Sequence, residues 1–149
     1  GKISIIVETL TDNKNRTVSN IRTMFQKHEG NLGTTGVATH KFKQLGVMRI
    51  EKKFILDEKI LELAIEAGAE ECISHQDFHE IFCSKEQFYK VKTLIEKKVC
   101  NFLYSGIEWF PLNQIDLSKD QYNSAIKLLE SLEDNDDVQN VYTNLKKKA

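Results

Sequence analysis

The chain between Val47 and Pro111 alternates short segments typical of strands with amphipathic segments typical of helices, and this alternation limits the possible folds more than any other feature. The predicted order is strand, helix, strand, strand, helix, strand. Six elements in this order within about 65 residues make the ferredoxin-like pattern. Residues 47–111 are therefore predicted to close a sheet of their own.

Two helices are predicted inside this segment from their apolar spacing and their end signals. The first runs from Asp57 to Gly68, a residue type that tolerates the left-handed conformation at a helix C-terminus. The second starts at the capping box Ser84–Gln87, whose side chains can satisfy each other's backbone N–H groups. Residues 72–74 and 80–83 are predicted to form a hairpin. The inward residues at helical spacing are Ile60, Leu61, Ala64 and Ile65 in the first helix, and Phe88, Val91, Leu94 and Ile95 in the second.

The two flanks of this segment supply the parts of a second unit of the same kind. The predicted parts are a strand over Ile3–Glu8, a helix capped by Asn15 or Thr17 and stopped by Gly30, a strand over 37–42 that ends before Leu45 and Gly46, a strand within Asn113–Leu117, a helix capped by Ser118 and a strand over 138–142. The fold class is therefore predicted as α+β, with two ferredoxin-like α/β domains, one inserted into the other. Residues 1–46 and 112–149 form the discontinuous domain, and residues 47–111 form the inserted one.

The composition suits a folded cytoplasmic protein. A chain of 149 residues with 40% hydrophobic residues is long enough for two small domains. No apolar run approaches the roughly 20 residues that cross a bilayer, and the first residues do not read as a secretory signal. Three cysteines, an odd number, favour reduced thiols. We expect a cytoplasmic location, with the mitochondrial matrix or another organelle as the alternative.

The charges are distributed unevenly along the chain although the net charge is only −1. Residues 1–53 hold ten Lys and Arg against four acidic residues, and residues 54–111 hold six against eleven. Such asymmetry points to contact between one part of the chain and a polyanion. The basic residues predicted to contact nucleic acid are Lys14, Arg16, Arg22, Lys27, Lys41 and Lys43.

A polar loop between the first strand and the first helix is the second candidate feature. A helix N-terminus beside basic side chains can receive a phosphate, and the same polar residues can equally serve only to cap and turn the chain. Two glycines further on match the GxxG spacing of KH domains, and they also suit a helix C-terminus. The candidate residues of these two motifs are Asp12, Asn13, Asn15, Thr17, Gly30 and Gly33.

The sequence offers little for metal binding or catalysis. Cys72, His75, His79 and Cys83 have zinc-like spacing, but a hairpin would place the two cysteines nearly opposite each other and His75 on the other face. We therefore expect buried cysteines and surface histidines in the turn. No nucleophile with a matching acid or base stands out, so we expect no catalytic residue, no metal, no cofactor and no enzymatic activity.

Four ordered segments resemble the YebC/PmpR family from end to end. They are Glu8–Thr17, Gly30–Gly33, Glu66–Glu70 and Asp136–Asn144. Bacterial members of that family are described as probable transcriptional regulators, and mitochondrial relatives as translational activators of cytochrome c oxidase. The resemblance implies two α/β domains, one inserted in the other, after a basic helical N-terminal domain that this chain lacks.

The resemblance implies a regulator of gene expression that binds nucleic acid, either promoter DNA or ribosomal RNA. The first expectation is a DNA-binding transcriptional regulator, and the alternative is a ribosome-associated translational activator or elongation-assisting factor. A second alternative is a module that binds a small ligand or peptide in a cleft between the domains. We expect a monomer with no membrane contact.

Overall fold

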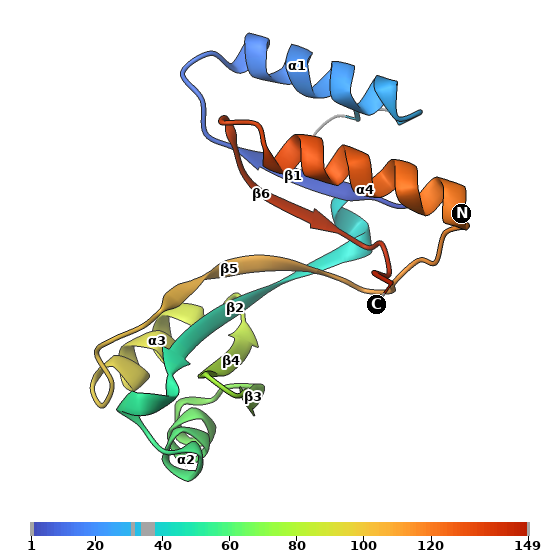
Figure 1. The fold of residues 1–149 in the computed structure, drawn as a ribbon. Coiled ribbons are helices and arrows are strands. Elements are labelled where there is room, and N and C mark those ends of the chain that lie inside the picture. The colour runs from blue at the N-terminus through green and yellow to red at the C-terminus, as the bar shows by residue number, and fades with distance from the viewer. Residues whose placement is uncertain (1, 31, 34–37, 149) are drawn as a thin grey trace. The chain divides into compact units, whose positions relative to one another are not determined.

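The computed structural model describes residues 2–30, 32–33 and 38–148, and it divides into two compact units (Figure 1). Unit 1 consists of Gly1–Lys43 and Phe110–Ala149, and unit 2 consists of Gln44–Trp109. The described residues form four α-helices and two antiparallel sheets, so the predicted α+β class is confirmed. No helix in the described part of the chain is long and apolar enough to cross a membrane.

Unit 2 has the ferredoxin-like order of elements. Along the chain they are β2 (Phe42–Glu51), α2 (Asp57–Ala67), β3 (Glu71–Ser74), β4 (Phe78–Ser84), α3 (Phe88–Glu96) and β5 (Tyr104–Pro111). The strands lie in the order β3-β4-β2-β5. The hairpin predicted from residues 72–83 is confirmed, as is the end of α2 at Gly68, which has a φ of 93°.

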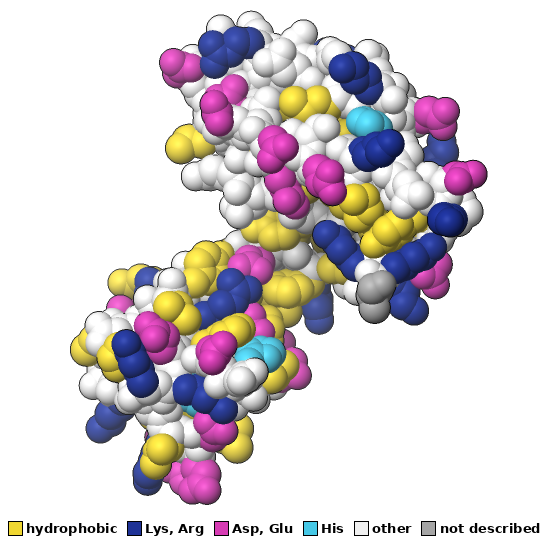
Figure 2. Space-filling model, viewed as in Figure 1, with side chains coloured by type: hydrophobic (Ala, Val, Ile, Leu, Met, Phe, Trp, Pro, Cys, Tyr) yellow, Lys and Arg dark blue, Asp and Glu magenta, His cyan; other side chains and the backbone are white. Residues whose placement is uncertain are grey.

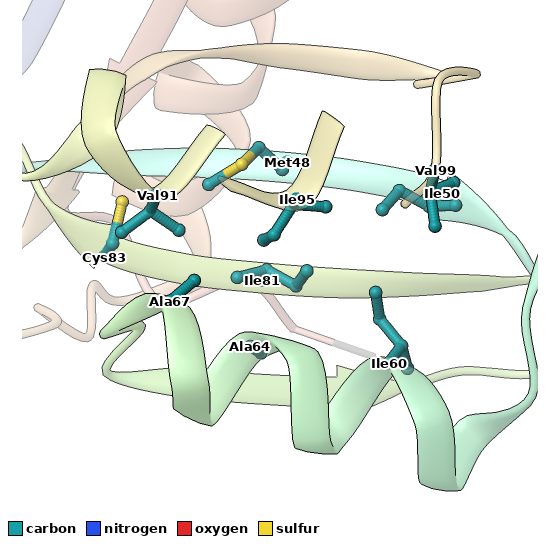
Figure 3. Packing of buried hydrophobic residues seen from close by; sticks show 10 residues of the cluster. All are labelled: Met48, Ile50, Ile60, Ala64, Ala67, Ile81, Cys83, Val91, Ile95 and Val99. Atoms are coloured by element: carbon teal, nitrogen blue, oxygen red, sulfur yellow. The ribbon is translucent and has the colours of Figure 1, made fainter. Parts of the chain in front are cut away.

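The core of unit 2 lies between one face of this sheet and the two helices (Figure 3). From the sheet, Met48 and Ile81 point toward the helices, and Ile60, Val91 and Ile95 point back toward the sheet. All five side chains are fully buried. The buried residues recur every three to four positions along the helices and at every second position along β4, so each element buries one face.

Unit 1 pairs the first strand of the chain with the last. Its elements are β1 (Ile5–Thr9), α1 (Lys14–Lys27), α4 (Lys119–Glu133) and β6 (Val138–Thr143). Ile21 and Phe25 of α1 pack with Leu128 and Leu132 of α4 in a separate buried cluster. The segment Asn113–Leu117, predicted as a strand, contributes one parallel bridge, between Ile115 and Leu145.

The predicted strand over residues 37–42 is wrong for residues 38–41 and right only for Phe42. Residue 37 lies outside the described residues, and Thr39–Lys41 form a turn of 3₁₀ helix. Strand β2 begins only at Phe42 and continues through Leu45 and Gly46 without the predicted break. Position 46 requires glycine because there is no room for a larger residue: an added Cβ would lie 2.4 Å from Cδ1 of Phe88. Here glycine admits an aromatic ring against the strand instead of ending the strand.

Candidate nucleic-acid interface

Helix α1 carries four of the six predicted cations and no carboxylate in its 14 residues. The helix forms because Thr17, Ile21 and Phe25 recur at helical spacing and are buried against the rest of unit 1. All four cations have exposed side chains: Lys14, Arg16, Arg22 and Lys27. A helix with only positive charges on its exposed surface can attract phosphate groups along its length.

The four cations do not form a single stripe along α1. Successive helical residues are about 100° apart, so Arg16 and Lys27 lie along one flank of the exposed face and Arg22 lies on the other. The surface between the flanks consists of hydrogen-bonding side chains without charge: Asn15, Ser19, Thr23 and Gln26. At the top of Figure 2, where Figure 1 draws α1, the dark blue side chains are likewise set apart by uncharged atoms.

Arg16 is the one cation of α1 with a recorded ion pair among the described residues. Its Nη2 lies 3.5 Å from Oδ1 of Asp12 and 3.7 Å from Oδ2 of Asp137. Asp12 is almost fully exposed and Asp137 is mostly covered. Two neighbouring carboxylates offset the charge of Arg16, so less of it is available to an external phosphate than the charge of Lys14, Arg22 or Lys27.

The polar loop before α1 is used largely to hold the helix in place. The helix cap is Asn13, whose Oδ1 accepts a hydrogen bond from the N–H of Arg16 at 3.1 Å. The predicted caps are therefore wrong: Asn15 is an exposed helical residue, and Thr17 is buried with its hydroxyl donating to Oδ2 of Asp137 at 2.8 Å. Asp137 stands directly before β6, and its side chain holds α1 through Thr17. Its backbone oxygen also accepts a hydrogen bond from the N–H of Leu10, the residue after β1.

Asp137 is the structural residue that sequence reasoning missed. In the sequence it stands in an acidic run after α4, where carboxylates are normally solvated. The signal that could have identified it is the antiparallel pairing of β1 with β6, which brings Thr9 opposite Val138 and so places Asp137 beside the loop.

The C-terminal end of α1 also differs from the prediction. The left-handed residue is Glu29, with a φ of 61°, and not Gly30. The N–H groups of Glu29 and Gly30 donate to the carbonyl oxygens of Gln26 and Phe25, which is the Schellman arrangement. Gly30 instead lies against Phe25, where a Cβ would be 3.3 Å from Cδ2 of its ring. Gly33 is exposed, and residue 31 of the GxxG motif lies outside the described residues.

The remaining two predicted cations, Lys41 and Lys43, are exposed at the start of β2. Lys41 borders a groove of about 330 Å³ within unit 1, which sequence reasoning did not identify because its walls come from distant segments. The groove is lined by His40, Lys41, Leu112, Asn113, Ile115 and Asn144. Asn144 is buried and fixed by accepting a hydrogen bond from the N–H of Ser4 at 2.7 Å. The groove therefore combines one cation, Lys41, with a polar wall.

The four residues with zinc-like spacing are used separately. Cys83 is buried in the core, and Cys72 pairs across the hairpin with Ile81. The prediction that both histidines lie at the surface is wrong for His79, which is fully buried. Its Nδ1 lies 2.7 Å from Oγ of Ser74 and its Nε2 lies 2.8 Å from the oxygen of Ile55. Within the part of the chain that the structure describes, no three His, Cys, Asp or Glu side chains are grouped so as to hold a metal ion.

Nearly the whole chain is similar to known proteins. Residues 1–145 match the family model described as the TACO1/YebC second and third domain. A probable transcriptional regulatory protein of Pelagibacter ubique is 57% identical over 144 residues, which cover 97% of this chain and 60% of that protein. A probable transcriptional regulatory protein of Syntrophus aciditrophicus is 40% identical, with 97% and 58% covered.

A solved structure is similar in fold as well. The crystal structure of a conserved hypothetical protein from Aquifex aeolicus has a TM-score of 0.80 and 36% sequence identity. The match covers 97% of this chain and 60% of that one. The chain thus spans about 60% of the length of the relatives that it matches.

Proposed function

Because this chain belongs to the TACO1/YebC family, as its motifs predicted, we propose that it acts as a non-catalytic regulator of gene expression that binds nucleic acid. Its relatives are named probable transcriptional regulatory proteins, which supports regulation as the general role. The odd number of cysteines, three, favours reduced thiols, and the cytoplasm is therefore the proposed location.

The absence of any carboxylate from α1 is the observation that carries the proposal. Lys14, Arg22 and Lys27 supply charge to phosphate groups, and the uncharged side chains between them donate hydrogen bonds to phosphate and sugar oxygens. Lys14 and Lys27 lie about 20 Å apart along the axis of α1, and the three side chains leave different sides of the helix, so we propose that they contact separate phosphate groups. Lys41 and Lys43, exposed on another segment of the chain, are proposed as additional phosphate contacts. Arg16 contributes less because Asp12 and Asp137 offset its charge.

Such an interface holds the phosphate backbone without reading bases. We therefore expect weak binding with little sequence preference, and a strong dependence on salt. With five cations engaged, namely those for which the described residues show no ion pair, the slope of log affinity against log salt is at most about −4.5 for duplex DNA. Sequence preference in a longer regulator would have to come from other contacts.

The test is the binding of this chain to a labelled 20-base-pair duplex and to a single-stranded RNA, followed by fluorescence polarisation over a range of KCl concentrations. The triple variant K14A/R22A/K27A is expected to bind at least about tenfold more weakly at low salt, with the duplex slope reduced by about 2.7. The control K90A/K97A/K98A makes the same charge change on exposed residues of unit 2 and is expected to bind within about twofold of the unaltered chain.

The two probes separate the two cellular roles. Tighter binding to the duplex supports the promoter role, and tighter binding to RNA supports the alternative role at the ribosome. Equal affinities of the α1 variant and the unaltered chain for both probes would eliminate α1 as the interface.

A further inference from the structure

Among the residues that the structure describes, β3 is an outer strand of the sheet of unit 2 and pairs with β4 on one side only. His75 N–H donates to the oxygen of Phe78 at 2.8 Å and closes the β3-β4 hairpin. Hydrogen-bonded and non-hydrogen-bonded pairs alternate along an antiparallel ladder. The backbone N–H and C=O groups of Ile73 therefore face β4, whereas those of Cys72 and Ser74 face the open edge. This edge can form hydrogen bonds to one further strand.

Helix α2 presents two exposed apolar side chains on the flank nearest this edge. Leu61 is 47% exposed and Ile65 is 67% exposed, and they lie one turn apart on the same side of the helix. The other flank of α2, with Lys59 and Leu63, borders a groove shared with Lys98 from the segment after α3. Helix α2 contacts both β3 and α3 (Figure 1). Since the flank with Lys59 and Leu63 faces the segment after α3, we infer from the helical spacing that Leu61 and Ile65 lie on the opposite flank, toward β3.

The charges around this edge are almost all negative. Residues 56–74 hold six carboxylates and a single cation, Lys59. Glu58 projects from the exposed surface of α2, and Glu70 and Glu71 lie at the start of β3. Glu62 and Glu66 are exposed as well, but they line the groove on the other flank of α2. The cation is already shared with Glu62, since the atoms that carry their charges are 3.9 Å apart. The surface therefore favours a ligand with positive charge.

We propose that this surface, formed by the open edge of β3 with Leu61 and Ile65 and here called the β3 edge site, binds an extended basic segment of a partner protein. The segment adds to β3 as a further antiparallel or parallel strand, with its backbone paired to Cys72 and Ser74. Apolar side chains on one face of the segment cover Leu61 and Ile65, and its Lys and Arg side chains meet the surrounding carboxylates. This interaction is separate from the phosphate contacts proposed for α1.

A second copy of the chain fits the β3 edge site poorly. Two copies joined edge to edge would bring Glu70 and Glu71 of each near the same residues of the other, and like charges across adjacent strands destabilise pairing. A nucleic acid is repelled by the same carboxylates. Charge complementarity thus selects a basic protein segment.

The test uses the full chain of 149 residues and a capped nine-residue peptide of alternating valine and lysine. Backbone NMR spectra recorded during titration are expected to shift at Cys72, Ile73 and Ser74 and along α2, and the amide hydrogens of Cys72 and Ser74 are expected to exchange more slowly. The variant I65S, at an exposed position, is expected to weaken binding about tenfold because apolar contact is lost. The control T93S changes an exposed residue of α3 and is expected to bind like the unaltered chain.

Two further peptides test strand addition itself. Each has N-methyl groups on alternate backbone nitrogens, in one phase or the other, so only one of them keeps the donors that face β3. Strand addition predicts that one phase abolishes binding and the other preserves it. Equal binding of both methylated peptides, no shift at millimolar peptide, or sedimentation as a dimer that I65S disrupts would each overturn the proposal.

Discussion

Thr17 is the residue on which the attachment of α1 depends. Its side chain is 1% exposed, and its hydroxyl lies 2.8 Å from both Oδ2 of Asp137 and Oγ1 of Thr11. We expect T17V, which keeps the shape and removes the hydroxyl, to lower the free energy of unfolding by about 1–3 kcal/mol, measured by urea denaturation. The control is T23V, because the exposed Thr23 hydroxyl bonds only within the helix; equal losses in the two variants would contradict this role.

Glu29 occupies a conformation that disfavours every side chain with a Cβ atom. Its φ of 61° lies in the left-handed region at the end of α1. We expect E29G to raise the free energy of unfolding by about 1 kcal/mol, because glycine adopts this conformation without the steric penalty. E29A keeps the Cβ and should leave stability near that of the unaltered chain. If E29A gained as much as E29G, the charge of Glu29 and not its conformation would be the cause.

Glu80 links the stability of unit 2 to pH. Burial alone raises the pKa of this carboxyl, but the hydrogen bonds and charges of Arg49 and His75 outweigh burial and hold the pKa below its usual value of 4.5. A carboxyl with a lowered pKa in the folded state stabilises fully above its unfolded pKa, and the effect is lost as the pH falls through the folded value.

Stability measured between about pH 6 and pH 2 is therefore expected to fall with decreasing pH below about 4.5, and to fall less steeply in E80Q. The exposed Glu86 provides the matched control E86Q. Acid-unfolding curves of the same steepness for E80Q and the unaltered chain would show that this ion pair does not couple unit 2 to pH.

At the scale of elements, local signals in the sequence identified most helices and strands. Helical spacing and a terminal glycine located α2, and a capping serine located α4, whose Ser118 hydroxyl accepts from the N–H of Gln121. Features that depend on distant residues could not be predicted in this way. Gly46 contacts Phe88, 42 positions later in the chain, so the local sequence indicates a break in the strand where there is none. The buried position of His79 likewise depends on a distant residue, because its ring bonds the carbonyl oxygen of Ile55.

Strand β2 and helix α3 fit together through the missing side chain of Gly46. A Cβ there would lie 2.4 Å from Cδ1 of Phe88 and 2.8 Å from Sγ of Cys83. We expect G46A to lower the free energy of unfolding by about 1–3 kcal/mol, because the ring has to move within a packed core. In a double-mutant cycle with F88L the two losses should be less than additive. Strict additivity would mean that the strand, and not the ring, opposes the added methyl group.

The candidate interface was predictable only in part, for the same reason. Periodicity placed four of the six cations on one helix, and the exposure of Arg22 and Lys27 followed from their positions outside its apolar face. Lys14 has the helical spacing of the apolar face and is exposed as the first residue of the helix. The pairing of Arg16 with Asp137 could not be read locally, since 121 positions separate the two residues. Sequence therefore identified the basic helix but overestimated its available charge.

At the scale of the whole molecule, each unit has its own core. The buried cluster of unit 2 comes from one continuous stretch of chain, whereas unit 1 needs both ends of the chain to pair β1 with β6. We expect a fragment of residues 44–109 to fold alone and to unfold cooperatively on heating, as many domains of this size do. A fragment of residues 1–43 should remain unfolded by circular dichroism. A featureless melt of fragment 44–109 would contradict this autonomy.

The chain passes from unit 1 to unit 2 after Lys43 and returns to unit 1 at Phe110. The two segments of unit 1 that flank this insertion are hydrogen-bonded to each other. The N–H of Leu112 donates to the oxygen of Lys41 at 2.9 Å, so the departure and return points are hydrogen-bonded neighbours. If unit 2 were removed, a turn of a few residues could join Lys41 directly to Leu112. An inserted domain attached at two neighbouring positions can be replaced or deleted while unit 1 keeps its fold, so these positions suit the insertion of other domains by design.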